Sequence, residues 1–300
     1  MGLTAIVLGA AGGGGFPQWN CRCAVCRLAW DGDPRVTPRT QASLAVSADE
    51  RHWILLNASP DLRAQIAATP ALRPREELRG SPIAAVVLTG AEIDQTGGLL
   101  TLRERTPFDL YGSAETLAAL AANPMFNVLA PDMVTRTRCK LGAPIRLSGN
   151  LEAVLFTVPG KVPLYLEGEN LELAGETEAN VGVELTDGKR RLVYVPGCAA
   201  VTPALRERLG RADVVLFDGT LFTDDEMIAS GTGAKTGRRM GHMPIDGEGG
   251  SLAALAGLSA RRIYVHINNT NPILVDGSAE RRKVLAAGWE IAEDGFKIAL

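Results

Sequence analysis

Two almost wholly apolar runs, residues 83–88 and 214–217, constrain the fold of this chain more than any other feature. Short runs of this kind, rich in valine and leucine, are typical of strands that other elements cover on both faces. Both runs end in polar residues, and the second leads directly into Asp218. We therefore predict a layered α/β protein in which helices pack outside the sheets.

Further strands and helices are expected along the whole chain. Apolar runs predict strands over 3–8, 43–47, 52–57, 154–158, 181–185, 192–195, 263–266 and 297–300, and helical spacing predicts helices over 61–66, 99–103, 204–209 and 251–258. The polar residues 48–51 indicate a hairpin turn. No repeat and no low-complexity linker divides the chain, so we expect one domain over 1–300. Two strand-rich halves with outer helices fit a four-layered αββα sandwich, although other α/β folds share this pattern.

The composition argues against several classes of protein. The 300 residues are 46% hydrophobic and 22% charged, with a formal net charge of -3. No lysine and arginine cluster could neutralise a run of phosphates, so we expect no nucleic acid partner. No stretch approaches the roughly 20 apolar residues that span a bilayer, and no basic region leads into a long apolar run at the start. We therefore expect a cytoplasmic protein without a membrane partner.

Three of the five cysteines, Cys21, Cys23 and Cys26, lie within six residues. They are too close together for a set of ordinary disulfides, whereas three thiolates at this spacing can bind one side of a tetrahedral zinc ion. A distant histidine would complete the site. We expect His266, which ends a predicted strand and precedes the polar segment 268–272. Four protein ligands would close the coordination sphere and make the zinc structural. The alternative is three free thiols in a loop.

A second group of candidate ligands follows the predicted strands. Glu92 and Asp94 come after the strand at 83–88, Asp218 ends the strand at 214–217, and His242 lies in a glycine-bounded loop. Polar residues at the ends of adjacent strands converge in a crevice, where open α/β folds bind ligands. One iron or zinc ion could bind among them. Alternatively, Asp218 forms a cap or turn, and Glu92 and Asp94 are solvated loop acids.

Arg238 and Arg239 are candidate substrate-binding residues, because paired guanidinium groups bind carboxylates in a bidentate manner. Surface arginines are also commonly just solvated. The glycine run at 12–15 suggests a phosphate loop, but the lysine and hydroxyl residues of a P-loop do not follow it.

The remaining histidine and cysteines have simpler interpretations. His52 lies within a predicted strand and is expected to be packed or half-exposed. Cys139 and Cys198 are isolated in the sequence, so we expect ordinary buried thiols. Cys198 follows a predicted strand at 192–195, which leaves it a possible role at the crevice.

Several long strings resemble the family of B proteins of pyrroloquinoline quinone (PQQ) biosynthesis. They are residues 9–21, 56–61, 217–220, 235–242 and 266–272, and the resemblance spans nearly the whole chain. It implies a metallo-β-lactamase fold. It also implies a role in making the redox cofactor PQQ from a glutamate-tyrosine precursor within a ribosomally made peptide.

The resemblance also implies two metal sites. The family's cysteine cluster falls on Cys21, Cys23 and Cys26, with His266 as fourth ligand of a structural zinc. The superfamily motif His-x-His-x-Asp-His aligns with residues 90–95, where this chain keeps only the aspartate, Asp94.

Two positions of that motif are Gly90 and Glu92, which is broadly usual for the family, but Gln95 replaces a histidine that its members normally have. A glutamine oxygen is a weaker ligand for iron than an imidazole nitrogen. The implied second site, for Fe(II) or a second zinc, comprises Asp94, Asp218 and His242, assisted by Glu92 or Gln95.

Three functions follow from these expectations. The first is an iron-dependent oxygenase that hydroxylates the tyrosine-derived ring, with Asp94, Asp218 and His242 at its centre. The second is a non-catalytic carrier involved in transport of PQQ or its precursor to the periplasm. The third is an ordinary hydrolase of the superfamily, which the missing histidines disfavour. The expected partners are PQQ or a glutamate-tyrosine-derived precursor, other PQQ biosynthesis proteins and a second copy in a homodimer.

Overall fold

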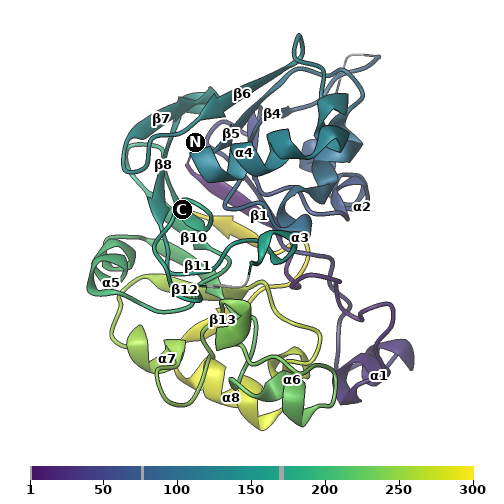
Figure 1. Ribbon diagram of the computed structural model, residues 1–300, viewed down its shortest axis with the longest axis vertical. Coiled ribbons are helices and arrows are strands. Elements are labelled where there is room, and N and C mark those ends of the chain that lie inside the picture. Colours follow the sequence, from purple (N-terminus) through teal and green to yellow (C-terminus); the bar gives the residue numbers. More distant parts are fainter. Residues whose placement is uncertain (1, 76–77, 169–171) are drawn as a thin grey trace.

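Two seven-stranded sheets lie at the centre of the protein within the residues that the computed structural model describes, 2–75, 78–168 and 172–300 (Figure 1). The first sheet has the order β14 (Lys297–Ala299), β1 (Thr4–Gly9), β2 (Ser43–Ser47), β3 (Trp53–Leu56), β4 (Ile83–Val87), β5 (Phe108–Gly112), β6 (Val134–Arg138). The second sheet has the order β13 (Trp289–Ile291), β12 (Arg261–Val265), β11 (Val214–Asp218), β10 (Arg191–Val195), β9 (Val181–Thr186), β8 (Leu151–Thr157), β7 (Pro144–Leu147). In the first sheet, the neighbouring strands from β3 through β6 pair in parallel. In the second sheet, the neighbouring strands from β10 through β13 do the same.

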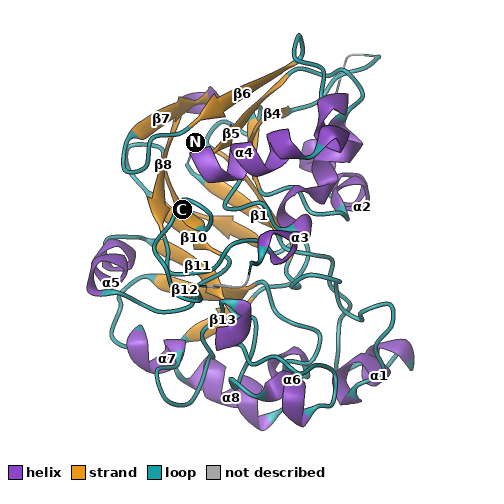
Figure 2. Ribbon diagram, in the orientation of Figure 1, coloured by secondary structure: helices purple, strands orange, loops and turns teal. Residues whose placement is uncertain are grey.

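Helices cover the outer faces of the two sheets (Figure 2). The α-helices are α1 (Ala24–Trp30), α2 (Leu62–Ala68), α3 (Ile93–Thr96), α4 (Ala114–Ala122), α5 (Pro203–Gly210), α6 (Glu226–Ala229), α7 (Ser251–Ala254) and α8 (Ala279–Ala286). The 3-10 helices are η1 (Pro70–Leu72), η2 (Gly97–Leu102), η3 (Pro124–Val128), η4 (Ser148–Asn150), η5 (Leu164–Leu166), η6 (Arg238–Met240) and η7 (Pro272–Leu274). None of the helices in the described ranges is both long and apolar enough to cross a bilayer.

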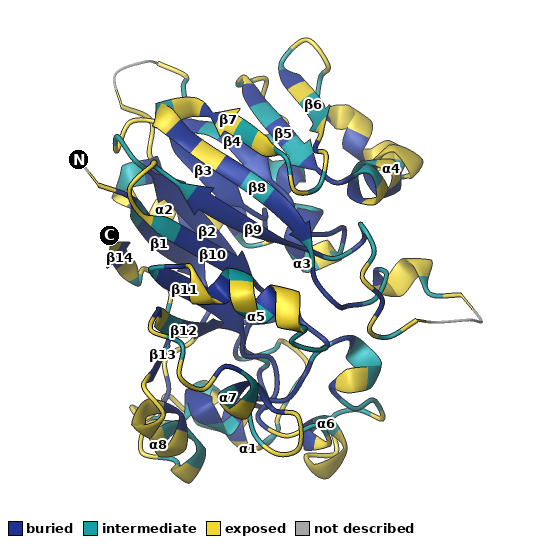
Figure 3. Cartoon of the chain, turned by 90° about the vertical axis from the view of Figure 1, so that its left-hand side faces the viewer, coloured by how far each residue is buried: buried dark blue, intermediate teal, exposed yellow. Residues whose placement is uncertain are grey.

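The two apolar runs lie between layers, as their composition predicts. In β11, Val214 and Leu216 pack into the core between the sheets, whereas Val215 and Phe217 pack under the outer helices. This alternation follows from the two-residue period of a strand. Most of the central strands are buried in Figure 3, and the exposed residues lie mainly on helices, loops and edges. The fold is therefore the expected αββα sandwich.

Most predicted elements are confirmed, including the antiparallel hairpin of β2 and β3. The helix predicted at 99–103 is instead the 3-10 helix η2, and the helix predicted at 251–258 ends at Ala254. Some elements were not predicted, because they are short or half-exposed and their apolar pattern is weak. They are β5, β6, β7, β13, α1, α3, α4, α6 and α8.

The ends of parallel strands from both sheets meet at one edge of the sandwich. The loop after β4 bridges to the start of β9 through Gly90 and Asn180, and the loop after β1 bridges to the residue pair after β12 through Ala11 and Ile267. The polar residues that follow these strands are therefore held close together, as is expected at the carboxyl ends of parallel strands.

Candidate metal centre

Three side chains at this edge gather around one point. Asp218 ends β11, His266 follows β12, and His242 lies after η6. One potential ligand atom of each lies within 4.8 Å of the other two. The two imidazole rings stack with their centroids 5.3 Å apart, and the Asp218 side chain is fully buried. These residues can share one metal ion.

Asp94 joins this group from the first sheet. It lies in the first turn of α3, and its Oδ2 atom is 2.8 Å from Nε2 of His266. Burial opposes ionisation of Asp94 and Asp218, but the hydrogen bonds and charges of His266 and His242 outweigh it and lower the pKa of both carboxyl groups. Both carboxylates are thus available as ligands.

The donor set fits a divalent metal. Oδ2 of Asp94 and Nε2 of His266 lie 2.8 Å apart, a hydrogen bond that needs a proton on one of the two atoms, and a metal ion bound to both would replace that proton. Carboxylate and imidazole donors in this proportion suit iron and zinc. Asp94, Asp218 and His242, which the sequence predicts as one site, are therefore brought together, and His266 is added to them.

A pocket of about 330 Å³ opens over these residues. Asp94, His242 and His266 belong to its more buried lining, and Leu164, Pro196 and Met240 provide apolar surface. Its other charged lining residues are Glu92, Lys161, Glu167 and Lys235, of which Glu92 and Lys235 are the more accessible, with side chains 34% and 42% exposed. A small molecule could therefore reach the metal-binding residues from a charged entrance.

Glu92 and Gln95 line the pocket but have other partners. Oε1 of Glu92 accepts hydrogen bonds from Nζ of Lys161 at 3.1 Å and from the backbone N–H of Leu164 at 3.0 Å. Oε1 of Gln95 accepts the backbone N–H of Glu92 at 3.2 Å, which caps α3. The sequence interpretation has either residue assist the metal, whereas the structure uses Glu92 to hold the Lys161 segment and Gln95 to cap a helix.

Arg238 and Arg239 do not line the pocket. Arg238 donates to the backbone oxygen of Glu248 at 2.7 Å, and Arg239 donates to the carboxylate of Glu167 at 3.0 Å. Their guanidinium groups are thus engaged within the protein. The pocket's own cations are Lys161 and Lys235, of which only Lys235 belongs to a string that the sequence singled out.

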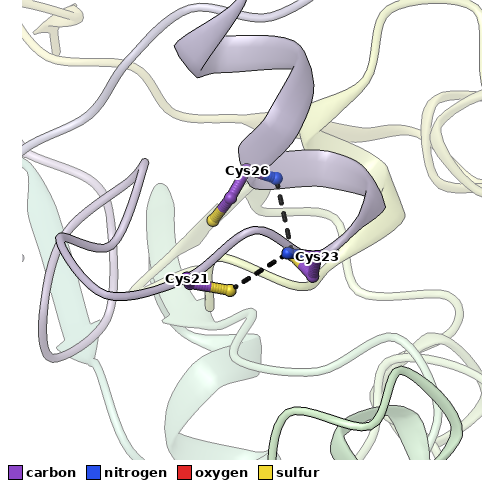
Figure 4. Close-up of side chains that lie close together, drawn as sticks. All are labelled: Cys21, Cys23 and Cys26. Atoms are coloured by element: carbon purple, nitrogen blue, oxygen red, sulfur yellow. Dashed lines mark hydrogen bonds between the residues drawn. The ribbon is translucent and has the colours of Figure 1, made fainter.

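The three clustered cysteines form a separate site. Figure 4 shows Cys21, Cys23 and Cys26 grouped at the start of α1. Their sulfur atoms all lie within 4.8 Å of one another. Asn269 faces them, with its Nδ2 atom 3.2 Å from the Sγ atoms of Cys21 and Cys26. A hydrogen bond from Cys26 lowers the pKa of Cys23, although burial opposes this. A thiolate in a group of three thiols fits a zinc ion.

His266 does not complete this cysteine site, contrary to the sequence-based expectation. Within the described residues, the group of thiols that could share an ion contains only the three cysteines, whereas His266 groups with Asp218 and His242. The reason is topological, since His266 lies at the carboxyl end of β12, beside the end of β11. Asn269, three residues later in the same polar segment, is the residue that contacts the cysteines.

The other singled-out residues have mostly structural roles. His52 is exposed and pairs with Asp49 at 2.7 Å, and Cys139 is buried. Cys198 is also buried, but its backbone N–H donates to Oδ2 of Asp218 at 2.8 Å. In the glycine run, Gly13 lies against Asp94, since a Cβ atom there would be 3.7 Å from Oδ2. The run is therefore a wall of the pocket.

Thr220 connects the members of the centre, and no pattern in the sequence predicts it. Its Oγ1 atom lies 2.6 Å from Oδ1 of Asp218, 2.9 Å from Nδ1 of His266 and 3.1 Å from Nδ1 of His242. A hydroxyl that bonds Nδ1 leaves Nε2 of that ring available to a metal. The only hint in the sequence is its place in the family string at 217–220.

We expect Thr220→Val to weaken metal binding at this centre by about tenfold, because both imidazoles lose a hydrogen bond that orients them. Competition against a chromophoric chelator measures this affinity. Thr220→Ser keeps the hydroxyl and should bind metal nearly as well as the parent protein. Equal affinities for the valine and serine variants would exclude an orienting role.

Comparison with known proteins first defines the class. The model of the beta-lactamase superfamily domain matches residues 52–267, which include the whole carboxylate-histidine centre. The chain also aligns with a diphosphatase of the PhnP family at 22% identity and a TM-score of 0.71, covering 100% of this chain and 98% of that chain, which shows a shared fold. The αββα sandwich is thus a metallo-β-lactamase fold.

The particular family follows from full-length similarity. The chain is 55% identical over 299 residues to coenzyme PQQ synthesis protein B of Methylobacterium nodulans, covering 99% of this chain and 100% of the relative. It is 52% identical to zinc-bound PqqB of Methylobacterium extorquens, whose crystal structure aligns with a TM-score of 0.98 over 99% of this chain and 100% of that chain. The chain belongs to the coenzyme PQQ synthesis protein B family.

Proposed function

We propose that this protein acts in PQQ biosynthesis as an iron-dependent oxygenase, which hydroxylates the tyrosine-derived ring of a glutamate-tyrosine precursor. Family membership supports the biosynthetic role, since the relatives are named for PQQ synthesis. The observation that carries the enzymatic proposal is the convergence of Asp94, Asp218, His242 and His266 around one point, at which all but the fully buried Asp218 line the pocket. Two imidazoles with carboxylates suit a non-haem iron that keeps open positions.

Each part of the pocket has a role in this proposal. Bound ferrous iron would supply the activation of dioxygen. Asp94, Asp218 and the two histidines would hold the metal, and Thr220 would orient the rings. Leu164, Pro196 and Met240 offer apolar surface against which an aromatic ring can pack while water is excluded.

We also infer a structural zinc site at Cys21, Cys23 and Cys26. The zinc-bound state of the Methylobacterium extorquens relative supports zinc binding in this family. Three thiolates provide most of a closed tetrahedral shell, and Asn269 is placed to shield or complete it. Such a site would hold the segment around α1 against the residues that follow β12.

A non-catalytic carrier of PQQ or its precursor, involved in transport to the periplasm, is the second candidate. The observation that favours it is Gln95, which the resemblance to the family aligns with a histidine of the metal motif and whose oxygen caps α3. The centre would then lack one nitrogen ligand while the pocket could still bind an aromatic acid. The two candidates differ in turnover and not in binding.

The test is a single-turnover reaction. Protein loaded anaerobically with ferrous iron receives a glutamate-tyrosine dipeptide, an external two-electron reductant such as ascorbate, and isotopically labelled dioxygen. Hydroxylation replaces a ring hydrogen by a hydroxyl group, and the second oxygen atom leaves as water. We expect mass spectrometry to show one labelled oxygen atom in the product.

Zinc-loaded protein is the matched control, because zinc has no redox chemistry. It should bind the dipeptide without forming product. If fully iron-loaded protein also binds the dipeptide and forms no product, the oxygenase proposal fails and the carrier remains. If neither the dipeptide nor PQQ binds to either form, both proposals fail.

A further inference from the structure

The lining of the pocket contains a lysine whose charge is already shared. Nζ of Lys161 is 3.1 Å from carboxylate oxygens of both Glu92 and Glu167, and it also donates to the backbone oxygen of Val162 at 3.1 Å. These three acceptors match the three hydrogens of the ammonium group. Its side chain is only 10% exposed. Lys161 therefore serves to hold Glu92 and Glu167 in place.

Lys235 is the less engaged cation at this entrance. Its shortest ion pair within the described residues joins Nζ to Glu167 at 3.9 Å, and its side chain is 42% exposed. Glu167 already binds Lys161 and Arg239 at about 3 Å. Among the residues that the structure describes, three cations thus pair with the two carboxylates of Glu92 and Glu167, and the most weakly paired of the three is Lys235.

The position of this charge relates it to the metal centre. Lys235 and the histidines His242 and His266 line the same pocket, and η6 separates Lys235 from His242 along the chain by only a few residues. The metal-binding side chains are mostly buried, whereas Lys235 is the most exposed of the charged lining residues that the ion pairs describe. A ligand bound in the pocket could therefore contact both the metal-binding residues and Lys235.

We propose that Lys235 binds a carboxylate of the substrate and so selects aromatic acids that carry a carboxylate on the side away from the reacting ring. This proposal rests on the proposed function, since it assigns the far end of the same ligand. Leu164 and Met240 would contact the ring between the two polar ends. Arg239, predicted from the sequence for this role, instead holds Glu167.

Binding measured on zinc-loaded protein tests the subsite without turnover. Calorimetric titration compares glutamate-tyrosine, which has a side-chain carboxylate, with glutamine-tyrosine and with the C-terminal amide of glutamate-tyrosine. We expect Lys235→Gln to weaken binding of glutamate-tyrosine about tenfold, as for a hydrogen bond between charged groups. For one of the two amide ligands, Lys235→Gln should not change the affinity at all. That ligand already lacks the carboxylate that Lys235 binds in the parent protein.

Two variants serve as controls. Lys235→Arg keeps the charge and should retain most of the affinity, whereas Lys189→Gln removes one charge from an exposed turn and should change nothing. If Lys235→Gln weakens all three ligands equally, or none, the subsite is wrong. If the parent protein binds none of the three ligands, the proposed function itself has failed. Failure of the subsite alone can therefore be told apart from failure of the proposed function.

Discussion

Asp218→Asn is expected to lower metal affinity at the carboxylate-histidine centre by at least about 100-fold and to abolish hydroxylation. The carboxylate of Asp218 accepts hydrogen bonds from the backbone N–H groups of Cys198 and Thr220, while it also bonds the Thr220 hydroxyl and Nδ1 of His242. An asparagine loses the charge and turns an NH₂ group toward one of those N–H donors. A buried donor that faces another donor costs about 1–3 kcal/mol.

Metal titration against a chelator measures the loss of metal affinity. Thermal unfolding of the metal-free protein separately measures the cost of the two facing donors. Asp132→Asn is the matched control, since Asp132 is exposed and pairs only with exposed Arg105 among the described residues. That variant should bind metal as the parent does. Parent-like metal affinity in Asp218→Asn would remove Asp218 from the centre and with it the enzymatic proposal.

The strand ends explain why part of this centre could be predicted from the sequence. The apolar runs at 83–88 and 214–217 identify buried strands, and carboxyl ends of parallel strands meet at one edge. Asp94 and Asp218 follow such strands, one in each sheet, and the bridge between Gly90 and Asn180 holds the two sheets together at this edge. His242 follows no predicted strand; its place in a glycine-bounded loop suggests it as a ligand, and the family string at 235–242 supports this.

His266 shows the limit of this reasoning. Three clustered thiols suggest a fourth ligand, and a chain with three histidines offers few candidates. The sequence contains no information on which of two metal sites lies nearer to the end of β12. The answer depends on the parallel pairing of β12 with β11, which places His266 beside Asp218, while Asn269 in the following polar segment contacts the cysteines.

The charged entrance was missed for a different reason. Lys161 and Glu167 lie after β8 in a segment without periodic apolar residues, so no pattern placed them at the pocket. The paired arginines drew attention because guanidinium groups suit carboxylates, yet Arg238 binds a backbone oxygen and Arg239 binds Glu167. Which cation remains available to a ligand depends on internal ion pairs, and these are visible only in three dimensions.

Cys26→Ser is expected to remove one zinc ion per chain and to lower the free energy of unfolding by more than about 2 kcal/mol. Cys26 is fully buried, and a hydroxyl is a poor ligand for zinc compared with a thiolate. The segment around α1 would lose its attachment to Asn269. Elemental analysis counts the zinc, and limited proteolysis reports the release of α1.

Cys139→Ser provides the matched control, because Cys139 is a buried thiol outside the cluster. It should lose some packing stability and keep all of its zinc. The comparison with Asp218→Asn then assigns each ion, since the two metal sites share no ligand. Zinc that survives Cys26→Ser but disappears in Asp218→Asn would belong to the carboxylate-histidine centre, and the three cysteines would then be free thiols in a loop.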